Sequence, residues 1–432
     1  MREAYRYSSN AALSLVIANM IGTGVFTSLG FQLLDISSSS VILFLWVLGG
    51  LLALCGALCY AELGAALPRS GGEYNYLSRI YHPGLGFVSG WVSVTIGFAA
   101  PTALAAMTAG HYLEAALPGV PATLTALGMV VLATVFHIRT RRASARFQQV
   151  FTALKLVLVL ALIVGLASAM SSSAENVWDP DLAVVGTGSF AVALIFVNYA
   201  YTGWNAATYI AGEVAQPNRN LPRILISGTA IVTVLYVALQ AVFLLSTPAE
   251  LMAGQLEVGY VVASHVFGEA GGQLISIVLA VLLISTISAM VLAGPRALQM
   301  VGQDQPSLSV LAKENASGIP VVAIALQSGL TILLVVTATF EAILVFSGSV
   351  LALNTLFAVV GVVVLRWREP DLLRPFRIPW YPLPVLVYAT ITIWTLYYLV
   401  LERPQEMAFA VAVVGSGWLF YWLSRARVRV QN

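Results

Sequence analysis

Two glycine-containing motifs interrupt long apolar stretches of the chain. The first, IGTG at 21–24, lies near the middle of the first stretch, and the second, AYTG at 200–203, lies near the middle of the sixth. Two glycines and a threonine within four residues weaken a helix by about 2 kcal/mol relative to alanine, so the chain can unwind there. Unwinding frees backbone N–H and C=O groups, which suit a carboxylate and an ammonium respectively. The two motifs together predict a binding site for a zwitterion.

Lys155 is the one charged residue between Arg146 and Glu175, and it lies inside the fifth apolar stretch. A lysine at such a depth in a membrane costs at least about 3 kcal/mol unless it snorkels to the surface, pairs, or meets a cavity. One possibility is that the side chain snorkels to the surface. The other is that its ammonium bonds to freed carbonyls of the first broken stretch and to hydroxyls of the eighth stretch, such as Ser285 or Ser288. It would then fill a place in which a Na⁺ could otherwise sit, and it could also carry a proton.

The elements that must hold these residues are predicted to be membrane-spanning helices. Of 432 residues, 59% are hydrophobic and 9% are charged, against roughly 25% charged in a soluble domain. The apolar residues form blocks of about 20 or more, the length that crosses the ~30 Å hydrocarbon core as a helix. The first block lacks a clear cleavage site, so we do not interpret it as a signal peptide. We expect an all-α integral membrane protein with twelve spans, at about 10–33, 41–66, 84–113, 121–138, 147–169, 188–212, 223–246, 271–294, 319–339, 342–365, 383–401 and 406–424.

The distribution of positive charge predicts the orientation of these spans. Of the 21 lysines and arginines, all but Lys155 and Arg403 fall on one side of the alternating path. Positive charge is enriched in cytoplasmic loops, so both termini are expected in the cytoplasm and the spans in the cell inner (cytoplasmic) membrane.

The two glycine-containing motifs occupy matching positions if spans 1–5 and 6–10 form a repeat. Because each half has an odd number of spans, the second half is inverted in the membrane, and paired broken spans are the usual sign of a central site. We expect one transmembrane domain over 1–432, with a first repeat at 1–170, a second at 187–366 and two further spans at 383–424. The competing interpretation is that the glycines serve only close helix packing.

Several stretches carry a family resemblance along nearly the whole chain. They are NMIGTGVF at 19–26, YAELG at 60–64, PRSGGEY at 68–74, YAYTGWN at 199–205, EVAQPNRNLPR at 213–223, GPR at 294–296 and RPFRIP at 374–379. In this order they resemble the amino acid–polyamine–organocation transporter superfamily, and within it the L-type amino acid transporters and their bacterial relatives.

The resemblance implies a five-plus-five inverted-repeat fold with discontinuous helices 1 and 6, working by alternating access. It also implies that the substrate carboxylate meets the N–H groups of Thr23 and Gly24, that Tyr199 is an outer gate, and that Lys155 replaces a sodium ion. Thr202 departs from the L-type pattern, which usually has a second glycine at this position. The preference of those transporters for particular substrate side chains therefore cannot be transferred to this chain. The predicted substrate-binding residues are Met20, Ile21, Gly22, Thr23, Gly24, Tyr199, Ala200, Tyr201, Thr202, Gly203, Asn205 and Asn354.

The resulting hypothesis is a Na⁺-independent transporter of neutral amino acids that works as an exchanger or with protons. Neutrality is favoured because no acidic residue is close in sequence to either motif. The alternative is a cationic amino acid or polyamine exchanger that uses cation–π contacts from Tyr199, Tyr201 or Trp204. An enzyme is disfavoured because the spans lack an Asp pair, an HExxH motif and a Ser–His–Asp set, and no channel filter motif is present. We expect an amino acid and the lipid bilayer as partners, and no cofactor, metal or nucleic acid; an accessory subunit is left open.

Overall fold

The computed structural model describes residues 7–139, 144–169, 181–316 and 318–430. Within them the regular structure is helical, apart from one isolated bridge between Tyr7 and Val214. The helices of the first half are α1 (Ser9–Met20), α2 (Gly24–Asp35), α3 (Ser39–Ala66), α4 (Gly72–Ile80), α5 (Pro83–Val92), the π-helical η1 (Ser93–Phe98), α6 (Ala99–Ala116), α7 (Ala122–Arg139) and α8 (Ser144–Ala169). Those of the second half are α9 (Gly188–Ala200), the 3₁₀ helix η2 (Ala206–Glu213), α10 (Pro217–Ser246), α11 (Ala249–Met252), α12 (Val258–Asp304), η3 (Pro306–Ala312), α13 (Val321–Thr337), α14 (Phe340–Arg368), α15 (Leu383–Glu402) and α16 (Pro404–Val430).

Long apolar helices make up most of this structure. Within the described residues, ten helical segments are long and apolar enough to cross a membrane, and α9 and α13 are shorter apolar helices. These segments fall at the twelve predicted stretches. The prediction of an all-α membrane protein is therefore confirmed.

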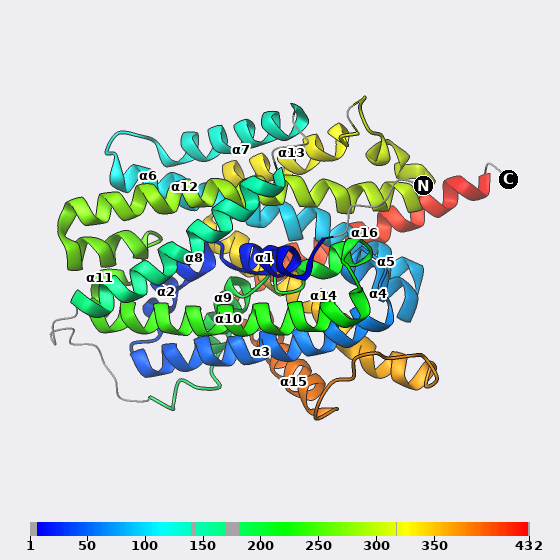
Figure 1. Cartoon of the computed structure of the whole chain (residues 1–432), viewed down its shortest axis with the longest axis horizontal. Helices are drawn as coiled ribbons and strands as arrows, with labels where there is room; N and C mark the ends of the chain where they lie inside the picture. Colours follow the sequence, from blue (N-terminus) through cyan, green and yellow to red (C-terminus); the bar gives the residue numbers. More distant parts are fainter. Residues whose placement is uncertain (1–6, 140–143, 170–180, 317, 431–432) are drawn as a thin grey trace.

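The helices lie side by side along the longest axis of the molecule, with the first broken span in the middle (Figure 1). In this view α3 and α10 pack together below α1, while α12 runs above it against α6. The start of α1 and the end of α16 point to the same end of the molecule. The elements that carry the glycine motifs are thus enclosed by other helices.

The longest helix, α12, changes direction at Gly268, whose backbone angles are φ 75° and ψ 174°. Only glycine adopts such angles without strain. The change separates a short outer segment at 258–267 from the part of α12 that corresponds to the predicted eighth span. A hydrogen bond of 2.8 Å from the Gly254 N–H to the Gly30 carbonyl ties the preceding turn to α2.

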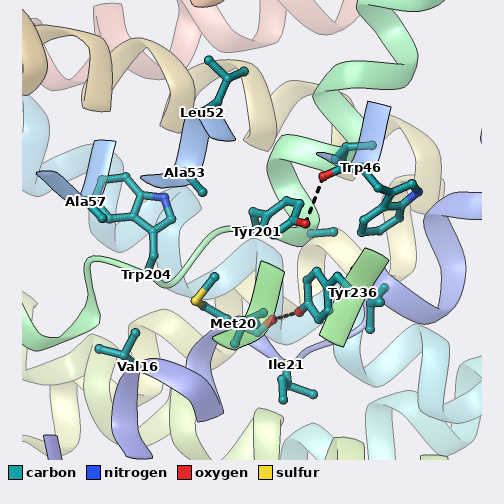
Figure 2. Packing of buried hydrophobic residues seen from close by; sticks show 14 of the residues in the cluster. Val16, Met20, Ile21, Trp46, Leu52, Ala53, Ala57, Tyr201, Trp204 and Tyr236 are labelled. Atoms are coloured by element: carbon teal, nitrogen blue, oxygen red, sulfur yellow. Dashed lines mark hydrogen bonds between the residues drawn. The ribbon is translucent and has the colours of Figure 1, made fainter. Parts of the chain in front are cut away.

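Aromatic packing fixes the broken segments against their neighbours (Figure 2). The Tyr201 and Tyr236 ring centroids lie 5.1 Å apart, and Trp46 meets Tyr236 edge-on at 5.8 Å. The Tyr201 hydroxyl donates a 3.0 Å hydrogen bond to the Trp46 carbonyl. Because rings of this size bury large apolar areas, the cluster joins α3 and α10 to both interrupted helices.

Candidate functional site

The first apolar stretch is interrupted at the predicted motif, because α1 ends at Met20 and α2 begins at Gly24. The freed Met20 carbonyl accepts hydrogen bonds from the Tyr236 hydroxyl at 2.5 Å and from the Gly22 N–H at 2.8 Å (Figure 2). The first N–H groups of a helix have no intrahelical acceptor, and the Thr23 side chain does not cap those of α2. The start of α2 therefore offers N–H donors in the middle of the membrane helix.

The sixth apolar stretch is interrupted between α9, which ends at Ala200, and η2, which begins at Ala206. Gly203 has φ +102°, a left-handed conformation that favours glycine. The Tyr199 carbonyl accepts bonds from the Thr202 N–H at 3.0 Å and from the Thr202 hydroxyl at 2.7 Å. Thr202 therefore occupies both lone pairs of the Tyr199 carbonyl.

The two interruptions are in direct contact. A Cβ atom built on Gly24 would lie 2.6 Å from the Ala200 Cα, and one built on Gly203 would lie 2.7 Å from the Asn19 carbonyl carbon. Real Cβ contacts are not this short, so only glycine permits the approach. The structure therefore brings the 21–24 and 200–203 motifs together, with the start of α2 in contact with the end of α9.

Lys155 lies on α8 and is 4% exposed. Its Nζ donates hydrogen bonds to the Ile21 carbonyl at 3.2 Å and to the Thr286 hydroxyl of α12 at 2.7 Å. The carbonyl belongs to the first broken stretch, as expected, and Thr286 is the neighbour of Ser285. A small cavity borders this lysine and is lined by Ile21, Gly22, Phe26, Lys155, Leu158, Leu279, Leu282 and Leu283.

The two serines proposed as lysine partners have other hydrogen bonds in the structure. The Ser285 hydroxyl donates to the Leu282 carbonyl at 2.7 Å. The Ser288 hydroxyl lies 2.8 Å from Nε2 of His137, a buried side chain at the end of α7. The residue that sequence reasoning missed is Thr286, and nothing in the sequence distinguishes it from its neighbours.

A second, larger cavity borders the interruption of the sixth stretch. Hydroxyl groups and small apolar side chains share its wall, and none of its lining residues is charged. The lining residues are Gly49, Leu52, Ala53, Asn198, Tyr199, Tyr201, Thr202, Trp204, Gly348, Leu351, Ala352, Thr355, Tyr388 and Thr392. Such a wall suits a neutral side chain of small or medium size.

Two further predicted residues, Asn354 and Asn205, lie outside the lining of this cavity. Asn354 is buried in α14, where its neighbour Thr355 borders the cavity instead. The Asn205 amide donates a 2.5 Å hydrogen bond to Oε1 of Glu73, which lies in the first turn of α4.

This contact corrects the sequence argument that no acidic residue is close to either interruption. Glu73 is 132 residues from Asn205 in the chain, so proximity in sequence did not reveal it. The feature of the sequence that could have suggested this contact is the Gly71-Gly72 pair directly before Glu73. Two adjacent glycines permit a sharp turn of the chain.

The sequence is similar to known proteins along nearly its whole length. Residues 8–418 match the model of the family described as amino acid permease. The b(0,+)-type amino acid transporter 1 of Mus musculus is 27% identical, over 96% of this chain and 86% of its own length. The large neutral amino acids transporter small subunit 2 of Homo sapiens is 28% identical over 96% and 79%. The Asc-type amino acid transporter 1 of Mus musculus is 28% identical over 96% and 80%.

Proposed function

Because the chain belongs to the amino acid permease family, it is a membrane transporter and not an enzyme, and we propose that it carries neutral amino acids without Na⁺. The observation that supports this most directly is the contact between the two interrupted helices. The α2 start supplies N–H donors for a carboxylate. Other carbonyls at the end of α9 supply acceptors for an ammonium, because those of Met20 and Tyr199 already accept two hydrogen bonds each. Met20, Ile21, Gly22, Thr23, Gly24 and the 199–203 segment are the proposed substrate-binding residues.

A neutral side chain is supported by the larger cavity, whose lining carries hydroxyls but no charge. Two of the relatives are named for neutral or Asc-type amino acid transport. Glu73 does not line this cavity, so it does not argue for a cationic substrate. We propose that Thr202 and Asn198 border the substrate side chain.

Independence from Na⁺ is supported by the place of Lys155. Its ammonium binds the Ile21 carbonyl, a group that an unwound membrane helix would otherwise leave to an ion or water. When it is protonated, Lys155 also repels a cation from this carbonyl. Uptake is proposed to proceed by alternating access, in exchange for a second amino acid or together with a proton.

The proposed architecture is twelve spans with a five-plus-five inverted repeat over 1–170 and 187–366. Helices that would be equivalent in the two halves pack against each other: α3 with α10, α6 with α12, and α7 with α13. The two interrupted spans meet through α2 and α9. A two-fold axis between the two halves would bring such equivalent helices together. We further propose that both termini lie in the cytoplasm, since that side carries most of the basic residues.

Counterflow in proteoliposomes tests this function. Vesicles loaded with unlabelled leucine, alanine or arginine are diluted into labelled amino acid, with Na⁺ or choline and with or without a pH gradient. Accumulation of labelled leucine or alanine that choline does not alter is expected. A requirement for Na⁺ would contradict the role given to Lys155, and counterflow of arginine alone would favour the cationic alternative. Stimulation by a pH gradient alone would indicate proton coupling.

A further inference from the structure

Glu73 is a buried carboxylate that the proposed transport site does not use. Its side chain is 1% exposed. Oε1 accepts hydrogen bonds from the Asn205 amide at 2.5 Å and from the Tyr60 hydroxyl at 2.8 Å. Tyr60 in turn packs edge-on against Trp204, with ring centroids 4.8 Å apart. The carboxylate therefore contacts the unwound segment at 201–205 both directly and through Tyr60.

The turn that carries Glu73 is docked on the cytoplasmic half of the sixth span. The Gly71 N–H donates to the Tyr209 carbonyl at 3.3 Å, and the Gly212 N–H donates to the Ser70 hydroxyl at 2.9 Å. Gly72 has φ +51°, and a Cβ there would lie 2.9 Å from the Tyr209 ring. The turn thus holds η2 at both of its ends, with Glu73 at the end that joins the unwound segment.

The charge on Glu73 has no cationic partner within 4.0 Å among the described residues. The groups that face it are hydroxyls, from Tyr60 on α3, Tyr76 on α4 and Tyr209 on η2. The neighbouring α5 carries no titratable side chain. On α14, which also packs against α4, the basic side chains have other partners: Arg366 pairs with Glu62, and Arg368 donates to the Ile80 carbonyl.

Burying a carboxylate without a cationic partner costs free energy, so other interactions must offset this cost. The N-terminal turn of α4 supplies part of it, because the helix dipole favours a negative charge at this position. Its other oxygen, Oε2, has no hydrogen-bond partner among the described residues. A glutamine oxygen could also accept the bonds from Asn205 and Tyr60. What the acid adds is its negative charge, which makes both of these hydrogen bonds stronger.

We propose that Glu73 is a positioning residue for transport: with Asn205 it forms an acid–amide pair that holds the unwound 201–205 segment in the geometry that binds the amino acid. The pair needs one acceptor-only carboxylate and one amide donor, and either residue can supply either group. This inference rests on the proposed function, because the 199–203 segment is the proposed substrate contact.

The test exchanges the two groups. Glu73→Gln, Asn205→Asp and the double exchange are compared with wild type in counterflow at pH 5.5 and pH 8. Glu213→Gln, the same change at an exposed residue of η2, is the matched control. Hydrogen exchange of the 200–213 peptide is measured on the same proteins without substrate, and α7 serves as an internal reference.

We expect Glu73→Gln to raise KM about tenfold with a smaller effect on the maximal rate, as loss of a buried hydrogen bond to a charged group predicts. Asn205→Asp should lose uptake at pH 8 and regain it at pH 5.5, because two adjacent carboxyls must share a proton. The double exchange should return KM to within about threefold of wild type, since one acid again faces one amide. Exchange of the 200–213 peptide should quicken in both single variants and return to normal in the double.

Wild-type KM in Glu73→Gln, or a double exchange as impaired as the single variants, would overturn the proposal. If Glu73→Gln does not fold, Tyr60→Phe, which removes one donor and keeps the acid, should still raise KM about threefold, and an unchanged KM would again contradict it. Should wild type itself show no counterflow, the proposed function fails, and hydrogen exchange alone decides whether the pair holds the segment.

Discussion

At the scale of single residues, Lys155 shows how a cation is accommodated inside a membrane helix. The side chain does not reach the surface; its ammonium instead binds a backbone carbonyl and a hydroxyl at 3.2 and 2.7 Å. Removing only the ammonium would leave both acceptors buried and unpaired. Charge-assisted hydrogen bonds of this kind are stronger than neutral ones. We therefore expect Lys155, which makes both bonds, to affect transport more than Thr286, which makes one of them.

Replacing Lys155 by methionine keeps the length of the side chain but removes its charge. We expect uptake to fall at least about tenfold, because the Ile21 carbonyl then lacks its donor. Thr286→Val, which removes one of the two bonds and leaves the ammonium on Ile21, should cost only about threefold. Initial rates of counterflow measure both. Equal rates for Lys155→Met and wild type would show that the ammonium is not needed.

Gly24 is a second position at which a single added carbon atom is expected to change amino acid binding and uptake. Gly24→Ala places a methyl group 2.6 Å from the Ala200 Cα, so the two interrupted helices must separate. We expect amino acid binding and uptake to fall at least about tenfold, since donors at α2 and acceptors at α9 lose their common geometry. Gly128→Ala on α7 is the matched control, because a Cβ there meets nothing within 4 Å. Normal binding by Gly24→Ala would rule out a carboxylate site at this contact.

At the scale of elements, the interrupted first span depends on side chains of its neighbours. Where α1 and α2 lose continuity, α10 donates from Tyr236 to the Met20 carbonyl at 2.5 Å and from Gln240 to the Val25 carbonyl at 2.7 Å. The Tyr112 hydroxyl of α6 donates to the Phe26 carbonyl at 3.2 Å. In a membrane the unwound backbone groups cannot turn to bulk water, so the Tyr236 hydroxyl replaces a missing helical hydrogen bond at the end of α1. The other two bonds fasten the first turn of α2 to its neighbours.

Tyr236→Phe tests this dependence by removing one hydroxyl and no packing volume. The Met20 carbonyl then keeps only the Gly22 N–H, and we expect KM to rise about fivefold to tenfold because the unwound segment is less well held. Tyr397→Phe, at an exposed tyrosine of α15, is the control and should behave as wild type. Saturation curves for uptake supply the comparison; an unaltered KM in Tyr236→Phe would mean that the hydroxyl does not support the site.

At the scale of the whole molecule, the ends of distant spans are joined by buried charge on the side where basic residues gather. Glu62, at the end of α3 and 2% exposed, accepts bonds from Arg366 of α14 at 2.8 and 2.6 Å and from the Ile378 N–H at 2.8 Å. Arg366 also stacks over the Tyr381 ring, 3.8 Å from its centroid. Fully engaged carboxylates of this type are tolerated when buried, so the second span is anchored to the tenth on the side where basic residues gather.

The orientation of the molecule can be measured at the two ends of α10. A cysteine at Glu250, just beyond its end, should react with an impermeant maleimide on intact cells or right-side-out vesicles. A cysteine at Arg219, in its first turn, should react only after permeabilisation, as the distribution of basic residues predicts. Both positions are exposed, and the native Cys55 and Cys59 are buried. Labelling in the opposite order would invert the proposed topology.

The sequence alone predicted the helical stretches, the two interruptions and the depth of Lys155, because hydropathy and glycine content are local properties of the chain. The two spans that Lys155 contacts were also expected, but most individual partners could not be predicted. Tyr236 meets Met20 across 216 residues, Glu73 meets Asn205 across 132, and Lys155 meets Thr286 rather than a group that its spacing would single out. Helices that are apolar on all sides give no signal of which face meets which neighbour. That choice follows from the summed packing of the whole bundle, and only the tertiary structure revealed it.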